Sequence, residues 1–376
     1  MEVLIVGGGI AGLATAIALR RAGHEVQILE RASQAAEVGA GLAIWPNGCR
    51  ALAALGAGDT RGLGVRRLQL RSWRGRLLGE MPLAELKGRY GFELILMHRT
   101  DLHGSLLEIL GRNAIQLGSE VIGFEPAGSR VRVALRSGRQ CDADLLVGAD
   151  GIRSTVRQAL LADGEPRFSG ATCWRGVTTF TLEEGSGTAF NWWGRGGEFG
   201  IFPLHDGRVY WFGVQNRPSG EADSPRGRKA DAMAAFASWP EVISAVVQAT
   251  DEGSVLRNDL YDRPPVRSWS WGRVTLVGDA AHPLLPNAAQ GACQALEDAV
   301  ALGNALQSGS IEGGLKIYEA RRVKAANSVV SRAHQTARMV QSTNPLMTGL
   351  RDLLVAHLPE SLVWRQLDSL MQPADR

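Results

Sequence analysis

A group of glycines near the N-terminus has the spacing of a nucleotide-binding turn. Gly7, Gly9 and Gly12 fit G-x-G-x-x-G, between an apolar run at 2–6 and an Ala/Leu-rich segment at 10–21. The run predicts a buried strand and the segment a helix. In such a turn the three glycines permit the tight bend, the approach of a pyrophosphate and the packing of helix on strand. Free N–H groups at the helix start would then face the phosphates.

An acidic residue follows at the distance expected of a ribose-binding carboxylate. Glu30 comes directly after a second predicted strand, 25–29, and eighteen residues after Gly12. A carboxylate there accepts hydrogen bonds from both ribose hydroxyls of an adenosine. Because it would repel a 2′-phosphate, the pattern predicts FAD or NAD. The alternative is a structural glycine turn followed by a solvated Glu30.

A third segment places an acid, two prolines and a glycine between a strand and a helix. Residues 273–299 read RVTLVGDAAHPLLPNAAQGACQALEDA, and Asp279 ends the apolar run. Asp279 is placed to accept hydrogen bonds from sugar-like hydroxyls. Pro286 helps to stiffen the loop, and Gly291 lets a flat ring approach the backbone. We interpret His282 as a brace of this loop, not as a catalyst.

The composition excludes several classes of protein. The chain has 376 residues, 45% of them hydrophobic, and a net charge of +3, which suits two or three domains with a large core. Lys and Arg form no block, which argues against a nucleic-acid partner. The four cysteines lie far apart and show no metal-ligand spacing, so we expect a reduced, cytoplasmic protein without a metal site. The apolar first nineteen residues lack a basic start and contain four glycines, so we expect no stable membrane insertion.

The middle of the chain changes to short, alternating, aromatic-rich runs. Between residues 171 and 271 these runs predict an antiparallel sheet, and seven of the ten Trp residues fall within 174–271. An aromatic-lined cavity over this sheet would suit a flat organic substrate, although we expect most of the aromatic side chains only to pack the sheet. Residues 315–340 predict a helix, and 345–376 predict short helices that either form a dimer contact or cap the fold.

With these motifs in order, the sequence resembles the single-component FAD-dependent monooxygenases, the aromatic hydroxylases with the p-hydroxybenzoate hydroxylase fold. The glycine turn, the Asp150-Gly151 pair and the Gly278-Asp279 pair carry the resemblance. The stretch VGAGLAIWPNGCRALAALGAGD at 38–59 is especially similar to the salicylate, 3-hydroxybenzoate and urate hydroxylases. The similarity spans residues 1–59, 99–157 and 174–322.

The resemblance implies an α/β fold. It comprises a Rossmann-like FAD-binding domain, an inserted antiparallel-sheet substrate domain and C-terminal helices. The expected ranges are 1–72, 99–170 and 272–335 for the FAD-binding domain, 73–98 and 171–271 for the sheet domain, and 336–376 for the helices.

The resemblance also implies which residues hold FAD. Arg99 is expected to reach the cofactor, a backbone contact to adenine is expected near Val121, and Asp150 is expected near the pyrophosphate and the path of the reductant. From the residues alone, Arg99 suits a surface charge and Asp150 a capped turn. The full expected set is Gly7, Gly9, Ala11, Gly12, Glu30, Arg31, Gly41, Ala43, Arg99, Val121, Asp150, Asp279, Gly291, Ala292 and Cys293. The N–H groups of Ala292 and Cys293 would stabilise negative charge on the N1–C2=O edge of a reduced flavin.

The implied activity is that of a hydroxylase. Such an enzyme takes hydride from transiently bound NADH or NADPH, captures O2 as a flavin C4a-hydroperoxide and hydroxylates a small aromatic or heteroaromatic substrate. The sequence has no second dinucleotide motif, which fits a transient reductant. The alternatives are a same-fold epoxidase or reductase, and a non-catalytic flavin-binding redox sensor. We expect a monomer or a homodimer.

The candidate catalytic residues are Glu198, Tyr210 and Pro286. Residues 198–210 predict a hairpin that could bring both strands under the flavin. The urate hydroxylases resemble this segment and keep a Tyr at Tyr210, but they carry an Arg where this chain has Glu198. A carboxylate would repel a urate anion, so urate is not the expected substrate. Glu198 could bind a cationic or donor group or act as a base toward a phenol or ring N–H, and the alternative is a solvent-facing Glu beside a glycine turn.

Overall fold

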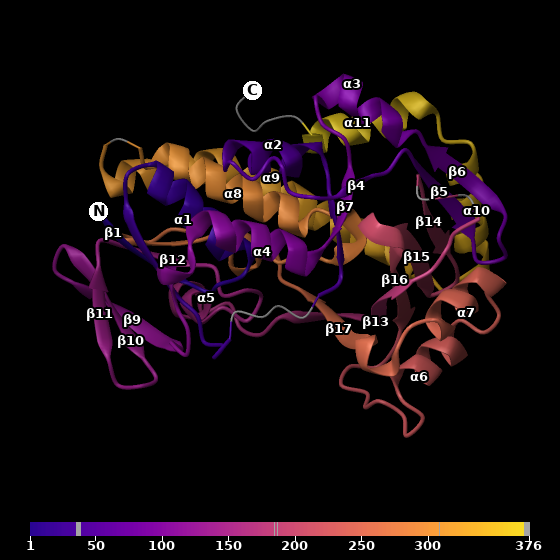
Figure 1. The fold of residues 1–376 in the computed structure, drawn as a ribbon, viewed down its shortest axis with the longest axis horizontal. Coiled ribbons are helices and arrows are strands. Elements are labelled where there is room, and N and C mark those ends of the chain that lie inside the picture. The colour runs from indigo at the N-terminus through magenta and orange to yellow at the C-terminus, as the bar shows by residue number, and fades with distance from the viewer. Residues whose placement is uncertain (35–38, 184, 186, 308, 372–376) are drawn as a thin grey trace.

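The computed structural model describes residues 1–34, 39–183, 185, 187–307 and 309–371 (Figure 1). Val38, at the start of the 38–59 stretch, and residues 372–376 of the expected C-terminal segment lie outside the described residues.

A five-stranded parallel sheet organises the N-terminal part of the fold. Its order is β18 (Val274–Leu276), β12 (Leu145–Gly148), β1 (Glu2–Val6), β2 (Glu25–Leu29) and β8 (Ile115–Gln116). β12 and the last four residues of β1 are fully buried, as expected of strands covered on both faces. The chain continues from β1 to β2 on one side, whereas β12 lies on the other. The carboxyl ends of strands at such a switch point form the usual place for a dinucleotide.

Helices from distant parts of the chain cover this sheet. They are α1 (Ile10–Arg21), α4 (Arg99–Leu110), α5 (Thr155–Leu161) and α8 (Gly291–Ala305). α1 and α8 pack closely, since a Cβ on Gly303 of α8 would lie 2.8 Å from the Cβ of Ala18. The first 143 residues also contain α2 (Pro46–Ala54), α3 (Leu86–Tyr90), a small sheet of β3 (Gly41–Ile44), β7 (Ile95–His98) and β4 (Leu63–Gly64), and a hairpin sheet of β9 (Val121–Ala127), β10 (Arg130–Leu135) and β11 (Gln140–Ala143).

A seven-stranded sheet lies beside this unit (Figure 1). Its order is β17 (Leu256–Asp262), β13 (Arg167–Thr179), β16 (Arg208–Asn216), β15 (Gly197–Pro203), β14 (Thr188–Trp193), β5 (Arg67–Ser72) and β6 (Leu77–Met81). On one face Trp174, Phe199 and Trp211 form a core with Phe236, under α6 (Arg228–Ala235) and α7 (Glu241–Gln248). Many of the aromatic side chains thus pack the sheet, as expected. The opposite face carries Glu198, Phe202 and Tyr210.

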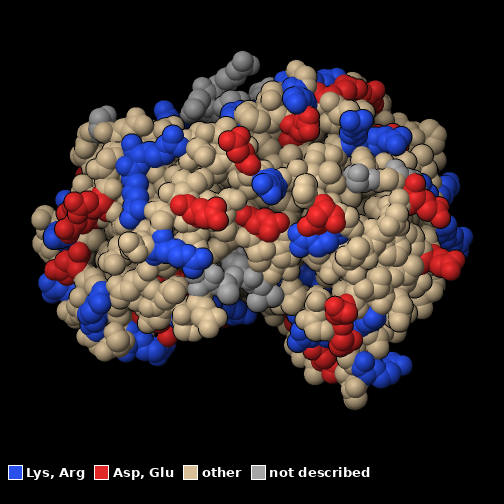
Figure 2. Space-filling view, viewed as in Figure 1, with Lys and Arg blue, Asp and Glu red and all other residues tan. Residues whose placement is uncertain are grey.

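Within the described residues, three helices follow α8. α9 (Ile311–Val340) is the long helix predicted from 315–340, and α10 (Pro345–Ala356) and α11 (Glu360–Met371) follow it. The predicted α/β architecture is therefore confirmed. No helix in the described ranges is long and apolar enough to cross a membrane. On the face shown in Figure 2, basic and acidic side chains are interspersed.

Candidate active site

Four residues of the expected FAD set follow four neighbouring parallel strands. Gly7 follows β1, Glu30 follows β2, Asp150 lies just beyond β12 and Asp279 just beyond β18. Since parallel strands end at one edge of a sheet, these residues share that edge. Arg99, at the start of α4, is close enough to Asp279 for its charge to lower the pKa of that carboxyl.

The glycine turn has the geometry that its spacing predicts. Gly7 has φ +104°, and a Cβ there would lie 2.5 Å from the carbonyl oxygen of Ala149. A Cβ on Gly12 would lie 1.9 Å from the carbonyl oxygen of Gly7. α1 begins after Gly9 without a side-chain cap from the described residues, so the N–H groups of its first turn are available to a phosphate.

The Glu30 carboxylate is oriented by two backbone donors. The N–H of Gly8 donates to Oε2 at 2.6 Å, and the N–H of Ala32 donates to Oε1 at 2.8 Å. A carboxylate accepts about four hydrogen bonds, so room remains for two ribose hydroxyls. Glu30 is partly exposed, as such a contact requires.

Asp150 caps the helix that follows it. Its carboxylate accepts hydrogen bonds from Ser154 Oγ and from the N–H of Thr155, the latter at 2.7 Å. Burial raises the pKa of Asp150, and the bond from Ser154 offsets part of that rise. Asp150 also adjoins the glycine turn, because a Cβ on Gly7 would lie 3.0 Å from its Cα. The capped turn is thus present beside the expected pyrophosphate site.

Asp279 is an acceptor with no donor among the residues that the structure describes. Its side chain reaches solvent. The surrounding protein nevertheless displaces enough water to raise the pKa of the carboxyl, and the charges of His282 and Arg99 offset part of that rise. Within the described ranges, no group donates a hydrogen bond to it. An accessible carboxylate with free lone pairs at the strand edge fits the hydroxyl groups of an FAD ribityl chain.

The start of α8 offers donors beside open space. A Cβ on Gly291 would meet no atom within 4 Å, and Gln290 Nε2 has no partner among the described residues. Cys293 is fully buried and accepts from the N–H of Trp45 at 3.4 Å, and burial raises the pKa of its thiol. The N–H groups in the first turn of α8 are thus placed to donate to the edge of a flavin ring. The residues present at this site fit FAD.

We expect Asp279→Ala to lower FAD affinity by roughly ten- to hundredfold, because it removes a charged acceptor that contributes about 1.5–3 kcal/mol. Flavin retained after dilution and gel filtration measures the effect. Asp279→Asn is the matched control and should lose less, since its amide oxygen still accepts. An alanine variant that stays fully yellow would refute this role.

The remaining expected contacts lie around the same edge. Ala11 lies against Gly278, where a Cβ would be 2.8 Å from the Cβ of Ala11. Arg31 is exposed, Ala43 is partly exposed in β3, and Val121 is buried at the start of β9. Contacts from these residues to FAD remain a prediction.

A buried ion network fixes the loop between β18 and α8. Asp298 accepts from His282 Nε2 at 2.5 Å, from Arg322 Nε at 2.8 Å and from the N–H of Gly278 at 2.9 Å. Although burial disfavours its charge, His282 and Arg322 lower the pKa of Asp298. This network agrees with the interpretation of His282 as a brace. Neither Asp298 nor Arg322 was expected from the sequence, because an acid and a base 24 residues apart carry no local signal.

Glu198 lies between the seven-stranded sheet and this loop. It is 4% exposed and accepts from Asn287 Nδ2 at 2.6 Å and from Asn191 Nδ2 at 3.3 Å. Burial raises its pKa to about 7, against the effects of Asn191, Arg351 and Asn287. The alternative of a solvent-facing Glu198 is therefore wrong.

The other two catalytic candidates lie at different points of this face. Pro286 is exposed and directly precedes Asn287, the partner of Glu198. Tyr210 packs on β3, since a Cβ on Gly41 would lie 2.3 Å from its ring. Glu198 pairs with Val214 across the strands, which puts Tyr210 roughly 13 Å further along the strand. The structure thus brings Glu198 to the Pro286 loop and Tyr210 to the expected FAD contact Gly41.

Three polar residues of this site were missed from the sequence. Asn191 and Asn287 hold the Glu198 carboxylate, and the charge of Arg351 lowers its pKa. Asn287 had a possible signal, since it is a polar residue in the proline-stiffened loop. Arg351 had none, because α10 is far from the motifs in the sequence.

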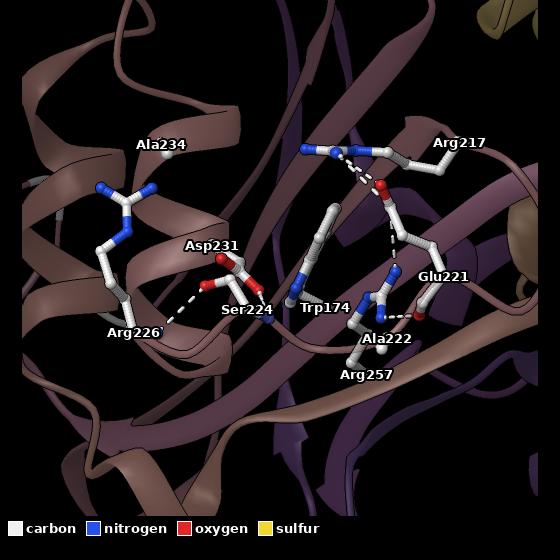
Figure 3. A pocket seen from close by; sticks show the side chains of 9 residues that line it. All are labelled: Trp174, Arg217, Glu221, Ala222, Ser224, Arg226, Asp231, Ala234 and Arg257. Carbon is white, nitrogen blue, oxygen red and sulfur yellow. Dashed lines mark hydrogen bonds and ion pairs between the residues drawn. The ribbon is translucent and has the colours of Figure 1, made fainter.

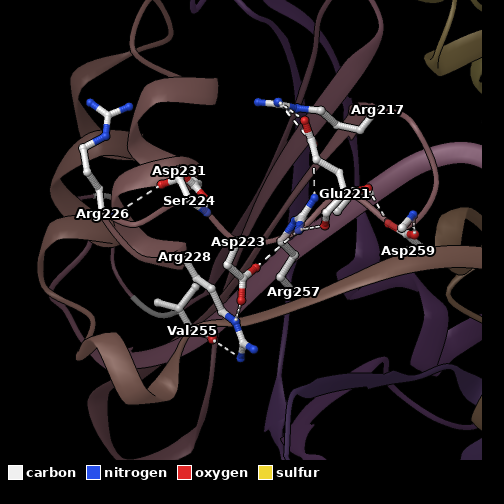
Figure 4. A network of polar contacts seen from close by, with 12 residues as sticks. Arg217, Glu221, Asp223, Ser224, Arg226, Arg228, Asp231, Val255, Arg257 and Asp259 are labelled. Carbon is white, nitrogen blue, oxygen red and sulfur yellow. Dashed lines mark hydrogen bonds and ion pairs between the residues drawn. The ribbon is translucent and has the colours of Figure 1, made fainter.

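A cavity of about 190 Å³ lies around Trp174 (Figure 3). Trp174 packs with Phe199 on the face of the seven-stranded sheet opposite to Glu198. Arg217 and Arg257 lie 5.5 and 5.7 Å from the Trp174 ring. Arg257 donates to Glu221 at 3.2 Å and to Asp223 at 3.3 Å (Figure 4). These ion pairs attach the loop that carries Glu221 and Asp223 to β17. Because the cavity lies on the other face of the sheet from Glu198, it is separate from the active site.

A shallower depression of about 410 Å³ lies beside the start of α5. It is lined by Ile122, Arg153, Ser154, Thr155, Gln158, Ala159, Glu165 and Arg263.

Comparison with known proteins gives a consistent result. The family described as FAD binding domain matches residues 1–333. The aurachin C monooxygenase/isomerase of Stigmatella aurantiaca is 37% identical over 359 residues, which cover 94% of each chain. The 3-amino-4-hydroxybenzoate 2-monooxygenase of Streptomyces cremeus is 36% identical over 348 residues, covering 90% of this chain and 87% of the relative.

The fold comparison agrees with the sequence comparison. Klebsiella pneumoniae HpxO, in its crystal structure with FAD and uric acid, has a TM-score of 0.92 at 28% identity, covering 99% of this chain and 96% of that one. The chain therefore belongs to the FAD binding domain family and is an FAD-dependent monooxygenase of the aromatic hydroxylase group.

Proposed function

We propose that the protein uses NADH or NADPH and O2 to hydroxylate a small aromatic or heteroaromatic molecule. The observation that carries this proposal is the position of Glu198, which is buried and bonded to Asn287 in the loop before α8. An ionisable group thus lies between the sheet and the loop that is expected at the ring of the cofactor. When bound, FAD supplies the redox and oxygen chemistry.

The residues of the chain then have three tasks. The backbone donors at the start of α8 stabilise negative charge at the ring edge. Glu198, with a pKa of about 7, can take a proton from a phenol or ring N–H and return it near neutral pH. The rings of Phe202 and Tyr210, 6.4 Å apart, offer an apolar surface to an aromatic substrate at the far end of the face.

The charge at Glu198 favours a substrate with a hydrogen-bond donor or a cationic group. A buried carboxylate and two side-chain amides surround that position. The Streptomyces relative is named for a substrate with an amino and a hydroxyl group, both of which are donors. This supports a donor-bearing aromatic molecule as the substrate class.

A screen of aromatic compounds with the purified yellow protein tests this function. The true substrate should accelerate NAD(P)H oxidation and yield a product that is heavier by one oxygen atom derived from O2. Acceleration with a product that lacks this atom would contradict hydroxylation.

Urate should not accelerate NAD(P)H oxidation, although HpxO, whose fold is similar, was solved with uric acid. Glu198 stands where the urate hydroxylases are expected to carry an Arg, and a buried carboxylate repels a urate anion. Oxygen uptake with and without urate measures this, with 3-amino-4-hydroxybenzoate as a comparison compound. Brisk urate-dependent uptake would overturn the argument about the substrate.

A further inference from the structure

Helix α10 presents its apolar side to solvent. Seven side chains on α10 and the segment after it are between 40% and 83% exposed: Leu346, Met347, Leu350, Leu353, Leu354, Leu358 and Leu362. At 100° per residue, the five on α10 occupy one continuous side of the helix. Soluble helices normally show the reverse arrangement, so this side is suited to contact another molecule.

The side of α10 that faces the protein carries two buried polar residues. Thr348 and Arg351 are each 5% exposed. Arg351 donates to the carbonyl oxygens of Gly194 and Val340, both at 3.2 Å, and pairs with Asp352 at 2.8 Å. These bonds fix the rotation of the helix, so the leucine side cannot simply turn inward.

The extent of the leucine side matches a protein interface. The five side chains on α10 expose roughly 560 Å², at the upper end of the 300–600 Å² typical of the largest patch on a monomer, and Leu358 and Leu362, which follow α10, add roughly 140 Å². A standard stable interface buries about 800 Å² on each partner. The spacing of Leu346, Leu350, Leu353 and Leu354 by three and four residues is that of ridges that pack helix against helix.

The chemistry of this side favours a second copy of the chain over a lipid surface. Helices that bind lipid surfaces are rich in Lys and Arg. α10 has one such residue, Arg351, and it is turned inward and paired. Residues 372–376, QPADR, are polar and so are poorly suited to cover leucines. The seven side chains are themselves uncharged, so two copies of this side can pack against each other, as a twofold interface requires.

We propose that this leucine side, from Leu346 to Leu362, is the interface of a twofold homodimer in which two α10 helices pack antiparallel. Leu350 lies near the middle of α10, so a twofold axis through that point brings the two Leu350 side chains together. α10 lies at the edge of the molecule beside β6, where a second copy has access (Figure 1).

Sedimentation of the FAD-loaded protein at micromolar concentration tests this proposal. The wild type should sediment as a dimer of 40.3 kDa chains. Leu350→Glu should weaken association at least about hundredfold, because it places two carboxylates face to face at the axis. Ile109→Glu makes the same change at a similarly exposed position of α4 and should leave the dimer intact. Equal melting temperatures and FAD contents of the two variants will show that folding is unaffected.

A monomeric wild type, or a Leu350→Glu variant that remains dimeric, would overturn the proposal. Co-sedimentation with phosphatidylserine vesicles separates the other possible occupant. Vesicle binding by a monomeric wild type that is lost in Leu350→Glu would assign this side of α10 to a lipid surface instead.

Discussion

Gly12→Ala should destabilise the protein and abolish its FAD binding, whereas Gly8→Ala should have much smaller effects on both. A Cβ on Gly12 would lie 1.9 Å from the carbonyl oxygen of Gly7, which is backbone and cannot rotate away. α1 would have to move off β1, at a cost of about 3 kcal/mol, and would carry its N–H groups out of position. A Cβ on Gly8 would lie 3.2 Å from Glu30 Oε2, the end of a side chain that can adjust.

The two variants make the same chemical change four residues apart, so they control for each other. The flavin-to-protein absorbance ratio and the urea midpoint measure the two effects. Equal ratios and equal midpoints would mean that the third glycine does not hold α1 against β1.

Glu198→Gln should change how stability depends on pH. Burial raises the pKa of Glu198 to about 7, well above its value in the unfolded chain. Between about pH 4.5 and 7 the unfolded state loses this proton while the folded state keeps it, so the free energy of unfolding falls by about 3 kcal/mol. Above pH 7 this contribution is constant. Glutamine is uncharged throughout, so the variant should gain about 3 kcal/mol relative to the wild type as the pH rises from 4.5 to 8.

Denaturant unfolding of both proteins at pH 4.5 and 8 isolates this contribution, because the other titrating groups cancel in the difference. Glu165→Gln, at a side chain that is 85% exposed, is the control and should follow the wild type.

If Glu198 also serves as a base, turnover of the true substrate by the Glu198→Gln variant should fall at least about tenfold, or about 1.4 kcal/mol, with FAD content unchanged. Parallel stability curves would show that the pKa of Glu198 is not raised in the folded protein, and wild-type turnover would show that Glu198 takes no part in the chemistry.

The local elements could be predicted from the sequence because their signals are local. β1, α1 and β2 begin and end at the residues predicted from the apolar runs and the glycine turn. The hairpin predicted over 198–210 is also present, since β15 pairs with β16 in continuous register through Pro203.

Long-range polar contacts could not be predicted in this way. The bond from Asn287 to Glu198 spans 89 residues, and only the folded chain shows that the carboxyl is buried. The exposure of the leucine side of α10 could not be predicted either. An apolar stripe indicates that one side of a helix is packed, but it does not show what that side packs against. In the structure it is Arg351 on the other side that faces the protein.

The network around Asp298 constrains how this sequence can diverge. Replacing Asp298 alone would leave Arg322 buried without its closest carboxylate partner and His282 without its acceptor, which costs several kcal/mol. Replacing all three by apolar residues of similar volume can be neutral. The three positions are therefore expected to change together during evolution. A related sequence either keeps the acid, the guanidinium and the imidazole, or it reaches their joint loss through a less stable intermediate in which only one of them has been replaced.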